Sequence, residues 1–361
     1  MNEKISSSET LAIEVGLITA LFPGIINPLL LTISKNASLI TLLISIFLGI
    51  IPLFIILTIS KNITTESLKD YMINNLGLLG KVLNIILIAI AIFILFLNSW
   101  LIIDFIISQF LTRTSYYFIA VVFFTIIGYT INKGIETTSR TVFVLTILVS
   151  IIMIALWICL IPYVNLNNLK PYIDVTNTRI MKSAILNAIY ISIPIIYLLD
   201  LKHITNDKEN FEKAIIKGYI ISSTIILIFV FFILAVYGIE LSTILTYPIY
   251  ALFKKIQILG FIERIENFAA IQIIVAFYIQ ATYLIYYIKE NLLKSKNGSK
   301  LINKLITYLT SLIVPLTSIY VFKNYNLITI LKKYPYIIGS ITIIITILLI
   351  KKAFNKTKHL L

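Results

Sequence analysis

Ten apolar stretches run through this 361-residue sequence, and each is close to the length needed to cross a membrane. A spanning helix takes about 20 mostly apolar residues. Hydrophobic residues make up 59% of the chain and charged residues 13%, about half of the roughly 25% usual in soluble domains. We therefore predict an all-α integral membrane protein with ten transmembrane helices at residues 10–33, 38–59, 82–108, 115–131, 141–161, 183–199, 218–239, 267–288, 305–322 and 335–350.

The first and the sixth of these stretches are each interrupted near the middle by a proline, Pro23 and Pro194. No water satisfies freed backbone groups inside a bilayer, so a helix breaks there only where protein or a wet cavity supplies partners. Breaks at matching depths in two halves are typical of transporters built from inverted repeats. We predict one membrane domain over residues 1–361, with a five-helix repeat at about 10–161 and an inverted one at about 183–350, both with a broken first helix; alternatively, both prolines only kink their helices.

The basic residues predict the orientation of the chain. The net charge is +14, and most of the 30 Lys and Arg residues fall in loops that share one side of the membrane, five lysines of loop 289–304 among them. Such an excess marks the cytoplasmic side, so we predict that both termini lie inside. The distribution favours contact with lipid head groups over binding of nucleic acid. Residues 1–9 lack the pattern of a cleaved signal peptide, so we expect the first span to be retained.

Two connections between spans are too long for simple turns. They predict a short surface helix at 64–76 and another at 246–257, the latter with Tyr250 and Phe253 turned toward the membrane. Both helices are expected to be structural collars rather than binding elements.

Residues suited to catalysis or metal binding are scarce. Cys159 is the single cysteine, and the two histidines, His203 and His359, fall in a loop and in the tail. They cannot supply a disulfide framework, a thiolate metal cluster or a Ser-His-Asp set. We therefore expect no cofactor, no metal site and no enzyme activity.

The two breaks suggest how a solute could be held. Gly24 allows the backbone to leave helical geometry, so the N–H groups of Gly24, Ile25 and Ile26 are expected to face an anion such as a carboxylate. The break in the sixth span is expected to free carbonyl groups near Tyr190 and Ile191, which could accept from an ammonium group. A site for a carboxylate and a site for an ammonium group together favour an amino acid as the solute. The candidate ligand-binding residues are Phe22, Pro23, Gly24, Ile25, Asn98, Asp104, Tyr190, Ser192, Tyr278 and Thr282.

Side chains of the eighth span could complete such a site. Tyr278, Gln280 and Thr282 are candidates for contacts with the solute. Alternatively, polar side chains of this kind serve packing between membrane helices.

Two carboxylates fall within the predicted spans. A carboxylate at membrane depth is costly and marks a functional candidate by default. Asp104 could face a wet cavity on the same helix as Asn98, or it could meet head groups near the outer end of its span. Glu14 lies only four residues into the first span, which favours a position at the membrane interface over a buried one.

Three ordered motifs carry a resemblance to a known family. Residues 132–140 (NKGIETTSR), 161–169 (IPYVNLNNL) and 245–248 (LTYP) followed by 261–266 (FIERIE) are similar to segments of the spore germination permeases. These resemble the B subunit of nutrient germinant receptors, within the amino acid/polyamine/organocation superfamily. Within the first motif, Glu136 and Arg140 can pair at a spacing of four residues.

The resemblance covers nearly the whole chain and implies more than the residues alone do. It implies a five-plus-five inverted repeat, a location in the spore inner membrane, and a complex with A-type and C-type receptor subunits. The family often carries a carboxylate in the third span, where Asp104 lies. The sixth span departs from the superfamily, because it offers Ser192 and Pro194 in place of a glycine-rich break.

Two functions follow as expectations. The first is a receptor subunit that binds a small nutrient, expected to be an amino acid, and signals germination with its partner subunits. The alternative is an ion- or proton-coupled amino-acid transporter, with Asp104 as the candidate proton carrier. One fold can serve both functions.

Overall fold

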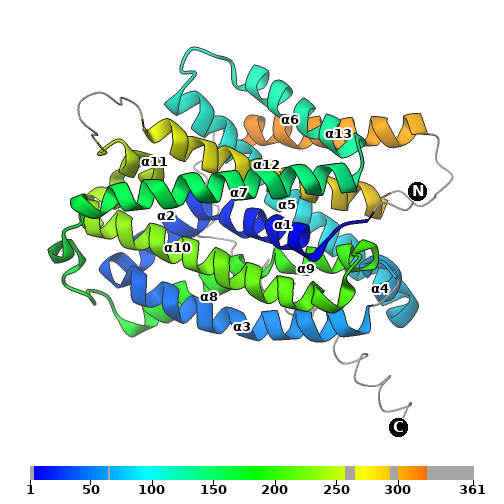
Figure 1. Cartoon of the computed structure of the whole chain (residues 1–361), viewed down its shortest axis with the longest axis horizontal. Coiled ribbons are helices and arrows are strands. Elements are labelled where there is room, and N and C mark those ends of the chain that lie inside the picture. Colours follow the sequence, from blue (N-terminus) through cyan, green and yellow to red (C-terminus); the bar gives the residue numbers. More distant parts are fainter. Residues whose placement is uncertain (1–3, 64–65, 257–264, 293–299, 323–361) are drawn as a thin grey trace, which may run out of the picture.

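The computed structural model describes residues 4–63, 66–256, 265–292 and 300–322, and this part of the chain is a bundle of helices (Figure 1). The helices are α1 (Ser7–Thr19), the π-helical turn η1 (Phe22–Ile26), α2 (Asn27–Ser34), η2 (Lys35–Ala37), α3 (Ser38–Asn62), α4 (Leu68–Leu76), α5 (Leu78–Gln109), α6 (Tyr116–Asn132), α7 (Ile135–Leu160), η3 (Ile161–Tyr163), η4 (Leu166–Leu169), α8 (Asn177–Ser192), α9 (Ile195–Leu198), η5 (Leu199–Ile204), α10 (Lys208–Ile244), α11 (Pro248–Phe253), α12 (Glu266–Leu292) and α13 (Lys300–Phe322).

Seven helical segments in the described ranges are long and apolar enough to cross a membrane. The first, Ser7–Asn62, contains two of the predicted spans. The predicted fourth span is present as α6, a shorter apolar helix of 17 residues. The predicted tenth span, 335–350, lies outside the described residues. The prediction of an all-α membrane protein is therefore confirmed, whereas the count of ten spans stays a prediction.

Helix ends follow local chemistry. Ser6 caps α1, because its hydroxyl accepts from the Glu9 N–H while the Glu9 carboxylate accepts from the Ser6 N–H. The surface helix expected at 64–76 is present as α4, and Ser67 caps it. Gly134 supplies the positive φ of 99° that the turn between α6 and α7 requires.

The second surface helix differs from the expectation. It is present as α11, but Tyr250 and Phe253 are buried inside the protein, not turned toward the membrane. The ring of Tyr250 packs edge-on against Phe105 of α5, with centroids 5.5 Å apart. Edge-on contacts between aromatic rings add stabilising free energy beyond that of burial. The contact between Tyr250 and Phe105 therefore favours packing of α11 against α5.

The two proline-broken segments pack in a reciprocal way. α1 packs against α10, while α8 packs against α3. The broken segments also touch one another, through α1 with α9 and through α2 with α8. α1 is further enclosed by α7 and α12, so the first break lies in the core of the bundle.

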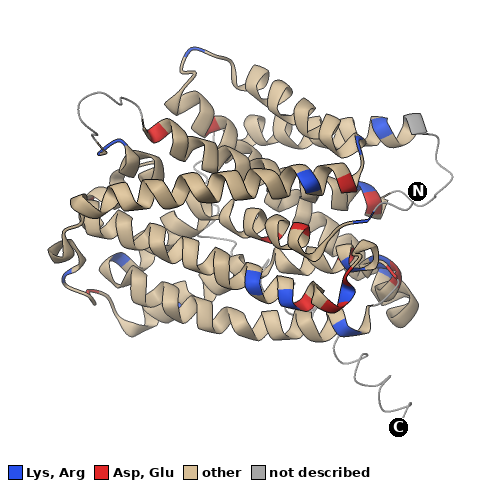
Figure 2. Ribbon diagram, in the orientation of Figure 1, with Lys and Arg blue, Asp and Glu red and all other residues tan. Residues whose placement is uncertain are grey.

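Charged residues keep to the ends of the helices. Most of them lie where α1, α7 and α10 begin, at the right of Figure 2, and the middle of the bundle is almost free of them. The outer faces are apolar, as shown by Phe47 and Phe54 of α3, each 69% exposed. A bundle with this surface suits a lipid environment.

Candidate functional site

The first break takes the form of a π-helical turn rather than an unwound stretch. The N–H groups of Ile25 and Ile26 both donate to the carbonyl of Leu21, at 3.1 and 3.0 Å. These two groups are not free to bind an anion, so the expectation that the N–H groups of Ile25 and Ile26 face a carboxylate is wrong, while that for the Gly24 N–H stays a prediction. The physical reason is that one extra residue in a helical turn keeps most backbone donors paired.

One carbonyl that loses its regular helical donor at the first break belongs to Leu17. In a regular helix the Leu21 N–H would bond to it, but here that N–H donates to Ile18. The Nε2 amide of Gln280 in α12 donates to the Leu17 carbonyl instead, at 2.7 Å. The Oε1 atom of Gln280 in turn accepts from the Nδ2 amide of Asn98 in α5.

These three groups are here named the break network: the Leu17 carbonyl and the side chains of Gln280 and Asn98. All three residues are buried, with Asn98 3% and Gln280 1% exposed. The Oδ1 atom of Asn98 finds no hydrogen-bond partner within the described residues. The network thus joins α1, α5 and α12 at the break and leaves one acceptor unused.

The other candidates of the first span are packed in the core. A Cβ atom on Gly24 would overlap the Leu101 side chain of α5, so glycine is needed there for close packing. The ring of Phe22 stacks on Phe229 of α10, with centroids 5.7 Å apart. Pro23 and Ile25 are buried in the π-helical turn itself.

The second break separates α8 from α9 at Ile193 and Pro194. Pro194 has no N–H, so it cannot supply the regular helical donor to the Tyr190 carbonyl. The Ser192 hydroxyl donates to the Ala188 carbonyl at 2.5 Å. The buried Tyr190 hydroxyl has no partner among the residues that the structure describes.

Tyr197, which follows the second break, ties that break to two neighbouring helices. Its hydroxyl donates to the Leu87 carbonyl of α5 at 3.1 Å. Its carbonyl accepts from the Tyr283 hydroxyl of α12 at 2.8 Å. Both broken segments are therefore held by the same two helices, α5 and α12.

The candidate residues of the eighth span, which is α12 in the structure, have different surroundings. The Tyr278 hydroxyl donates to the Thr130 hydroxyl of α6 at 3.0 Å, which is packing between helices rather than a contact with either break. The Thr282 hydroxyl is buried and has no partner in the described part of the chain. Gln280, which lies between them in sequence, is the residue that reaches the break.

The two carboxylates within the predicted spans differ in burial. Asp104 is half-buried near the end of α5, and its carboxylate accepts from the Tyr247 hydroxyl at 2.5 Å. Glu14 is fully buried in α1, so its expected place at the membrane interface is wrong. The carboxylate of Glu14 lies against Gly218 of α10, where a Cβ atom would overlap it, and neither oxygen has a partner in the described ranges.

A group of polar contacts at the end of the bundle where α4 and α10 begin was not predicted. The Nζ ammonium of Lys202 contacts the Glu212 carboxylate and the Ser60 carbonyl, both at 2.6 Å. Near them, the Asp200 carboxylate accepts from the Leu68 N–H at the start of α4, at 3.0 Å. These contacts join α3, α4, η5 and α10, and only the folded chain brings them together.

The first two motifs of the sequence have structural roles away from the breaks, whereas residues 261–264 of the third motif lie outside the described part of the chain. Glu136 and Arg140 form the expected ion pair on α7, at 2.5 Å. Asn168 donates to the Ala235 carbonyl at 2.9 Å, at the kink where Gly238 interrupts α10 with a φ of 67°. Among the described residues there is no group of three His, Cys, Asp or Glu side chains that could hold a metal ion.

Comparisons with known proteins identify the family and the fold of the chain. A family model described as "Spore germination protein" matches residues 19–326. A solved structure of a Na+-coupled sialic acid symporter, in a substrate-bound outward-open state, aligns with 95% of this chain and 79% of its own, with a TM-score of 0.67 at 11% identity. At this identity the likeness shows the fold alone. No curated protein sequence matches the chain.

Proposed function

We propose, from the premise that the chain belongs to the spore germination protein family, that it is a nutrient receptor subunit of the spore inner membrane. In this proposal it binds a small solute, an amino acid, where the two broken helices meet. It passes the resulting change of conformation to A-type and C-type partner subunits. The family match and the transporter-like fold support a membrane permease or germination role.

The observation that carries the proposal is the break network. Gln280 satisfies a backbone carbonyl that a bound solute with a donor group could satisfy equally well. An ammonium group that displaced the Gln280 amide from Leu17 would change the contacts of α1, α5 and α12 at once. Such an exchange would convert binding into movement of helices, which a receptor requires.

The reciprocal packing of the broken segments supports a five-plus-five inverted repeat. If α1 and α3 correspond to α8 and α10, a two-fold axis in the membrane plane would exchange the pair α1–α10 with the pair α8–α3, and both pairs are packed together. The distribution of lysines in the loops supports a cytoplasmic location for both termini in this proposal.

Ligand binding to the assembled receptor tests the proposal. The chain would be purified with its A-type and C-type partners and titrated with amino acids, sugars and nucleosides by calorimetry. An amino acid that binds the wild-type complex and binds more weakly when Asn98 is changed to Leu supports the site. Binding that is unaffected by this change, with the complex intact, would place the solute on another surface.

A proton-coupled transporter is the second candidate, and Glu14 is the observation that favours it. A fully buried carboxyl group on a broken helix, with no partner in the described part of the chain, is the kind of group that exchanges protons in membrane transporters. Uptake of a labelled amino acid into vesicles that hold this chain alone, driven by a pH gradient and lost in Glu14→Gln, would select the transporter. No uptake by the isolated chain, together with binding by the complex, would select the receptor.

A further inference from the structure

A cavity of about 300 Å³ lies beside the first break and is separate from the break network. It is lined by residues of α1, α7, α10 and α12 and is open on one side. Gly16 and Thr19, one and a half turns or less before the break, line it on the α1 side. The volume is at the lower end of the range for small-molecule sites.

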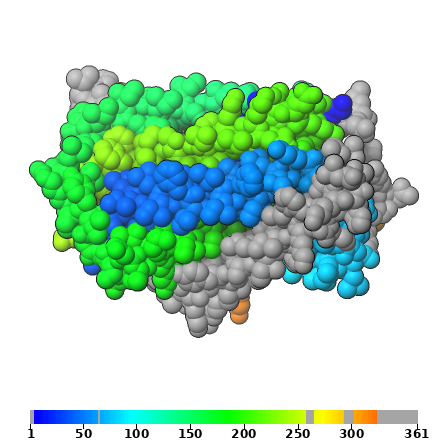
Figure 3. All heavy atoms as spheres, turned by 90° about the horizontal axis from the view of Figure 1, so that it is seen from below, coloured from blue at the N-terminus to red at the C-terminus, as the bar shows by residue number. Residues whose placement is uncertain are grey.

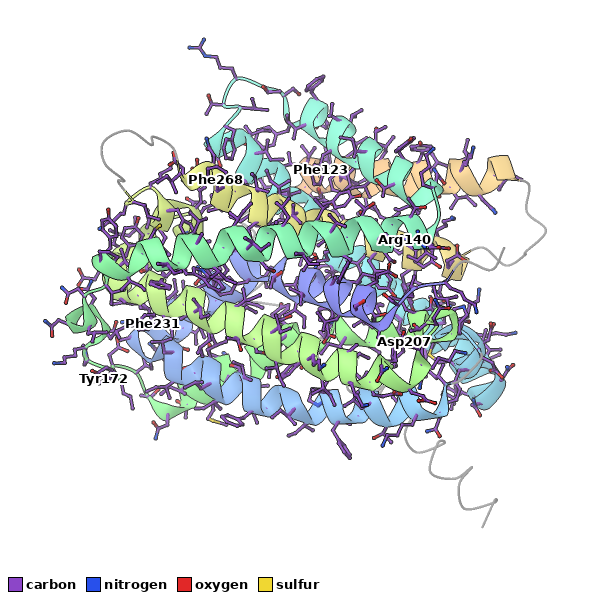
Figure 4. All side chains as sticks on the ribbon, viewed as in Figure 1. Phe123, Arg140, Tyr172, Asp207, Phe231 and Phe268 are labelled. Carbon is purple, nitrogen blue, oxygen red and sulfur yellow. The ribbon has the colours of Figure 1, made fainter. Side chains whose placement is uncertain are left out.

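The hydroxyl groups in the lining donate to carbonyls of their own helices, whereas the side chains of Trp157 and Gln272 lie at one end of the cavity; the residues with these hydroxyls are Thr19, Thr146, Ser150 and Thr224. α7 and α10 run in the same direction, from the Arg140 and Asp207 end toward the Tyr172 and Phe231 end, while α12 starts near Phe268 and runs the opposite way (Figure 4). Trp157 of α7 and Gln272 of α12 therefore line the same end. Thr146, at the other end, is about 16 Å away along α7.

Two buried polar atoms at that end lack partners. The indole Nε1–H of Trp157 and the Oε1 atom of Gln272 have none within the described residues, and Gln272 is only 8% exposed. A buried donor or acceptor without a partner costs roughly 1–3 kcal/mol. One donor and one acceptor are thus available to a molecule in the cavity.

The rest of the lining limits what that molecule can be. Among the described residues, no Asp, Glu, Lys, Arg or His lines the cavity, so an ion or a zwitterion would lose its hydration without a compensating charge. A lipid acyl chain offers no hydrogen bond to Trp157 or Gln272. A single hydroxyl group on a short hydrocarbon body can accept from the first and donate to the second.

The entrance faces lipid. Ile154 and Ile220 line the cavity and are 55% and 57% exposed. An outer groove between α3, α7 and α10 shares Ile154, Trp157 and Ile228 with the cavity. Figure 3 shows the face on which α3 and α10 lie side by side. A molecule dissolved in the bilayer could enter by this route.

An aromatic chain connects the cavity with the break. Trp157 packs edge-on against Phe229, with centroids 5.7 Å apart, and Phe229 stacks on Phe22 of the π-helical turn. A molecule bound beside Trp157 would therefore brace the break in the arrangement seen here.

We propose that this cavity is a second site, which takes a small neutral amphiphile with one hydroxyl group, such as a medium-chain primary alcohol, from the membrane. The hydroxyl group lies between Trp157 and Gln272, and the hydrocarbon body extends toward Thr146. Occupation holds α1 against α7 and α10 and opposes movement at the break. The site is independent of the proposed nutrient site and would exist in either a receptor or a transporter.

Tryptophan fluorescence tests this site directly, because Trp100 and Trp157 are the two tryptophans of the chain. In the Trp100→Phe protein only Trp157 emits, and in the Trp157→Phe protein only Trp100, which stacks on Tyr116 away from the cavity. Both proteins would be placed in lipid nanodiscs and titrated with 6-bromohexan-1-ol, whose bromine quenches fluorescence at short range. We expect saturable quenching of Trp157 and only weak, non-saturable quenching of Trp100.

Two further comparisons separate binding from partition into lipid. The Gln272→Leu change should raise the half-saturating concentration about three- to tenfold, while Gln109→Leu on the exposed end of α5 should leave it unchanged. On the unaltered Gln272 protein, 6-bromohexyl methyl ether, which accepts but cannot donate, should show the same weakening. If 1-bromohexane quenches Trp157 as strongly and as saturably as the alcohol, or if both tryptophans respond alike, the proposal is overturned.

Discussion

The side-chain amide of Gln280 lies 2.7 Å from the backbone carbonyl of Leu17, which the first break deprives of its helical donor. The break is therefore stabilised by the protein itself and does not depend on a bound ion at this carbonyl. Because Gln280 also accepts from Asn98, the two sides of one amide group join α1 to α5. A change of partner at this amide is the simplest way in which a solute could act on the fold.

Replacement of Gln280 by Leu should destabilise the protein. The change removes the donor and leaves the Leu17 carbonyl and the Asn98 amide buried without partners, at a cost of about 1–3 kcal/mol each. We expect a lower melting temperature in detergent and a weaker nutrient response. Tyr278→Phe on the same helix, which loses a contact with Thr130 far from the break, is the matched control and should leave the nutrient response unchanged. Equal responses of Gln280→Leu and wild type would show that the network is not used.

Gly24 should be required for packing rather than for contact with an anion. A methyl group at this position would overlap Leu101, and an overpacked core typically costs 1–3 kcal/mol. Gly24→Ala should therefore lower the melting temperature, and Leu101→Ala in the same chain should restore part of it by opening space. If the double variant is less stable than the sum of the two single changes, the overlap is not the cause.

Variants at Glu14 and Gly218 should separate the effect of the Glu14 charge from the effect of its volume. Glu14→Gln keeps the volume beside Gly218 and removes the ionisable group, so the protein should accumulate normally. If the carboxyl exchanges protons, the response or the uptake should lose its dependence on external pH in this variant. Gly218→Val, which overlaps the carboxylate, should instead lower the amount of folded protein. A Glu14→Gln protein with an unchanged pH profile would exclude a role in proton exchange.

The sequence predicted where the backbone breaks but not what the breaks contact. Proline removes a donor wherever it stands in a helix, so Pro23 and Pro194 located both breaks. Whether the freed carbonyl meets a solute, a cation or a side chain depends on the neighbour across the helix interface. Gln280 and Leu17 are far apart in sequence, and the spacing of apolar residues contains no information on that neighbour.

The two carboxylates show the same limit. Glu14 was expected at the interface because it lies near the start of its apolar stretch. The structure begins α1 earlier, at Ser7, and pairs Ile5 with Thr205 in front of it, so Glu14 is enclosed by neighbouring segments. Asp104 was expected to face a wet cavity or head groups, but the hydroxyl of Tyr247, from the third motif, donates to its carboxylate. The position of a residue along its apolar stretch can be read from a sequence, whereas its burial by neighbouring helices cannot.

The orientation of the chain can be measured with single cysteines. After Cys159 is replaced by Ser, a cysteine at Asn74 of α4 should be shielded from an impermeant thiol reagent in intact cells, and one at Asn167 of η4 should be labelled. Both positions are exposed at the protein surface, so a difference in labelling reports the side of the membrane. The reverse pattern would contradict cytoplasmic termini.

The Lys202–Glu212 contact should stabilise the end of the bundle where α10 begins and limit access of solvent to it. The two side chains lie 2.6 Å apart and are 6% and 20% exposed, and the Ser60 hydroxyl donates to the same carboxylate oxygen at 2.7 Å. Removal of one partner leaves a largely buried charge unpaired, which costs about 3–5 kcal/mol for fully buried pairs and less here because Glu212 is partly solvated. Lys202→Met and Glu212→Gln should each lower the melting temperature more than expected from lost packing.

A double-mutant cycle separates the pair from its surroundings. The combined Lys202→Met/Glu212→Gln protein should be more stable than the sum of the single changes predicts, with a coupling above about 1 kcal/mol. The Glu136–Arg140 pair of α7 is the matched control, because its side chains are 38% and 69% exposed and exposed pairs typically couple by less than about 1 kcal/mol. Because Lys202 and Glu212 join η5, which follows the second break, to α10, their loss should also expose a cysteine placed at Ser60 to thiol reagents from the cytoplasmic side. A cysteine that stays protected in the double variant would show that other contacts close this end.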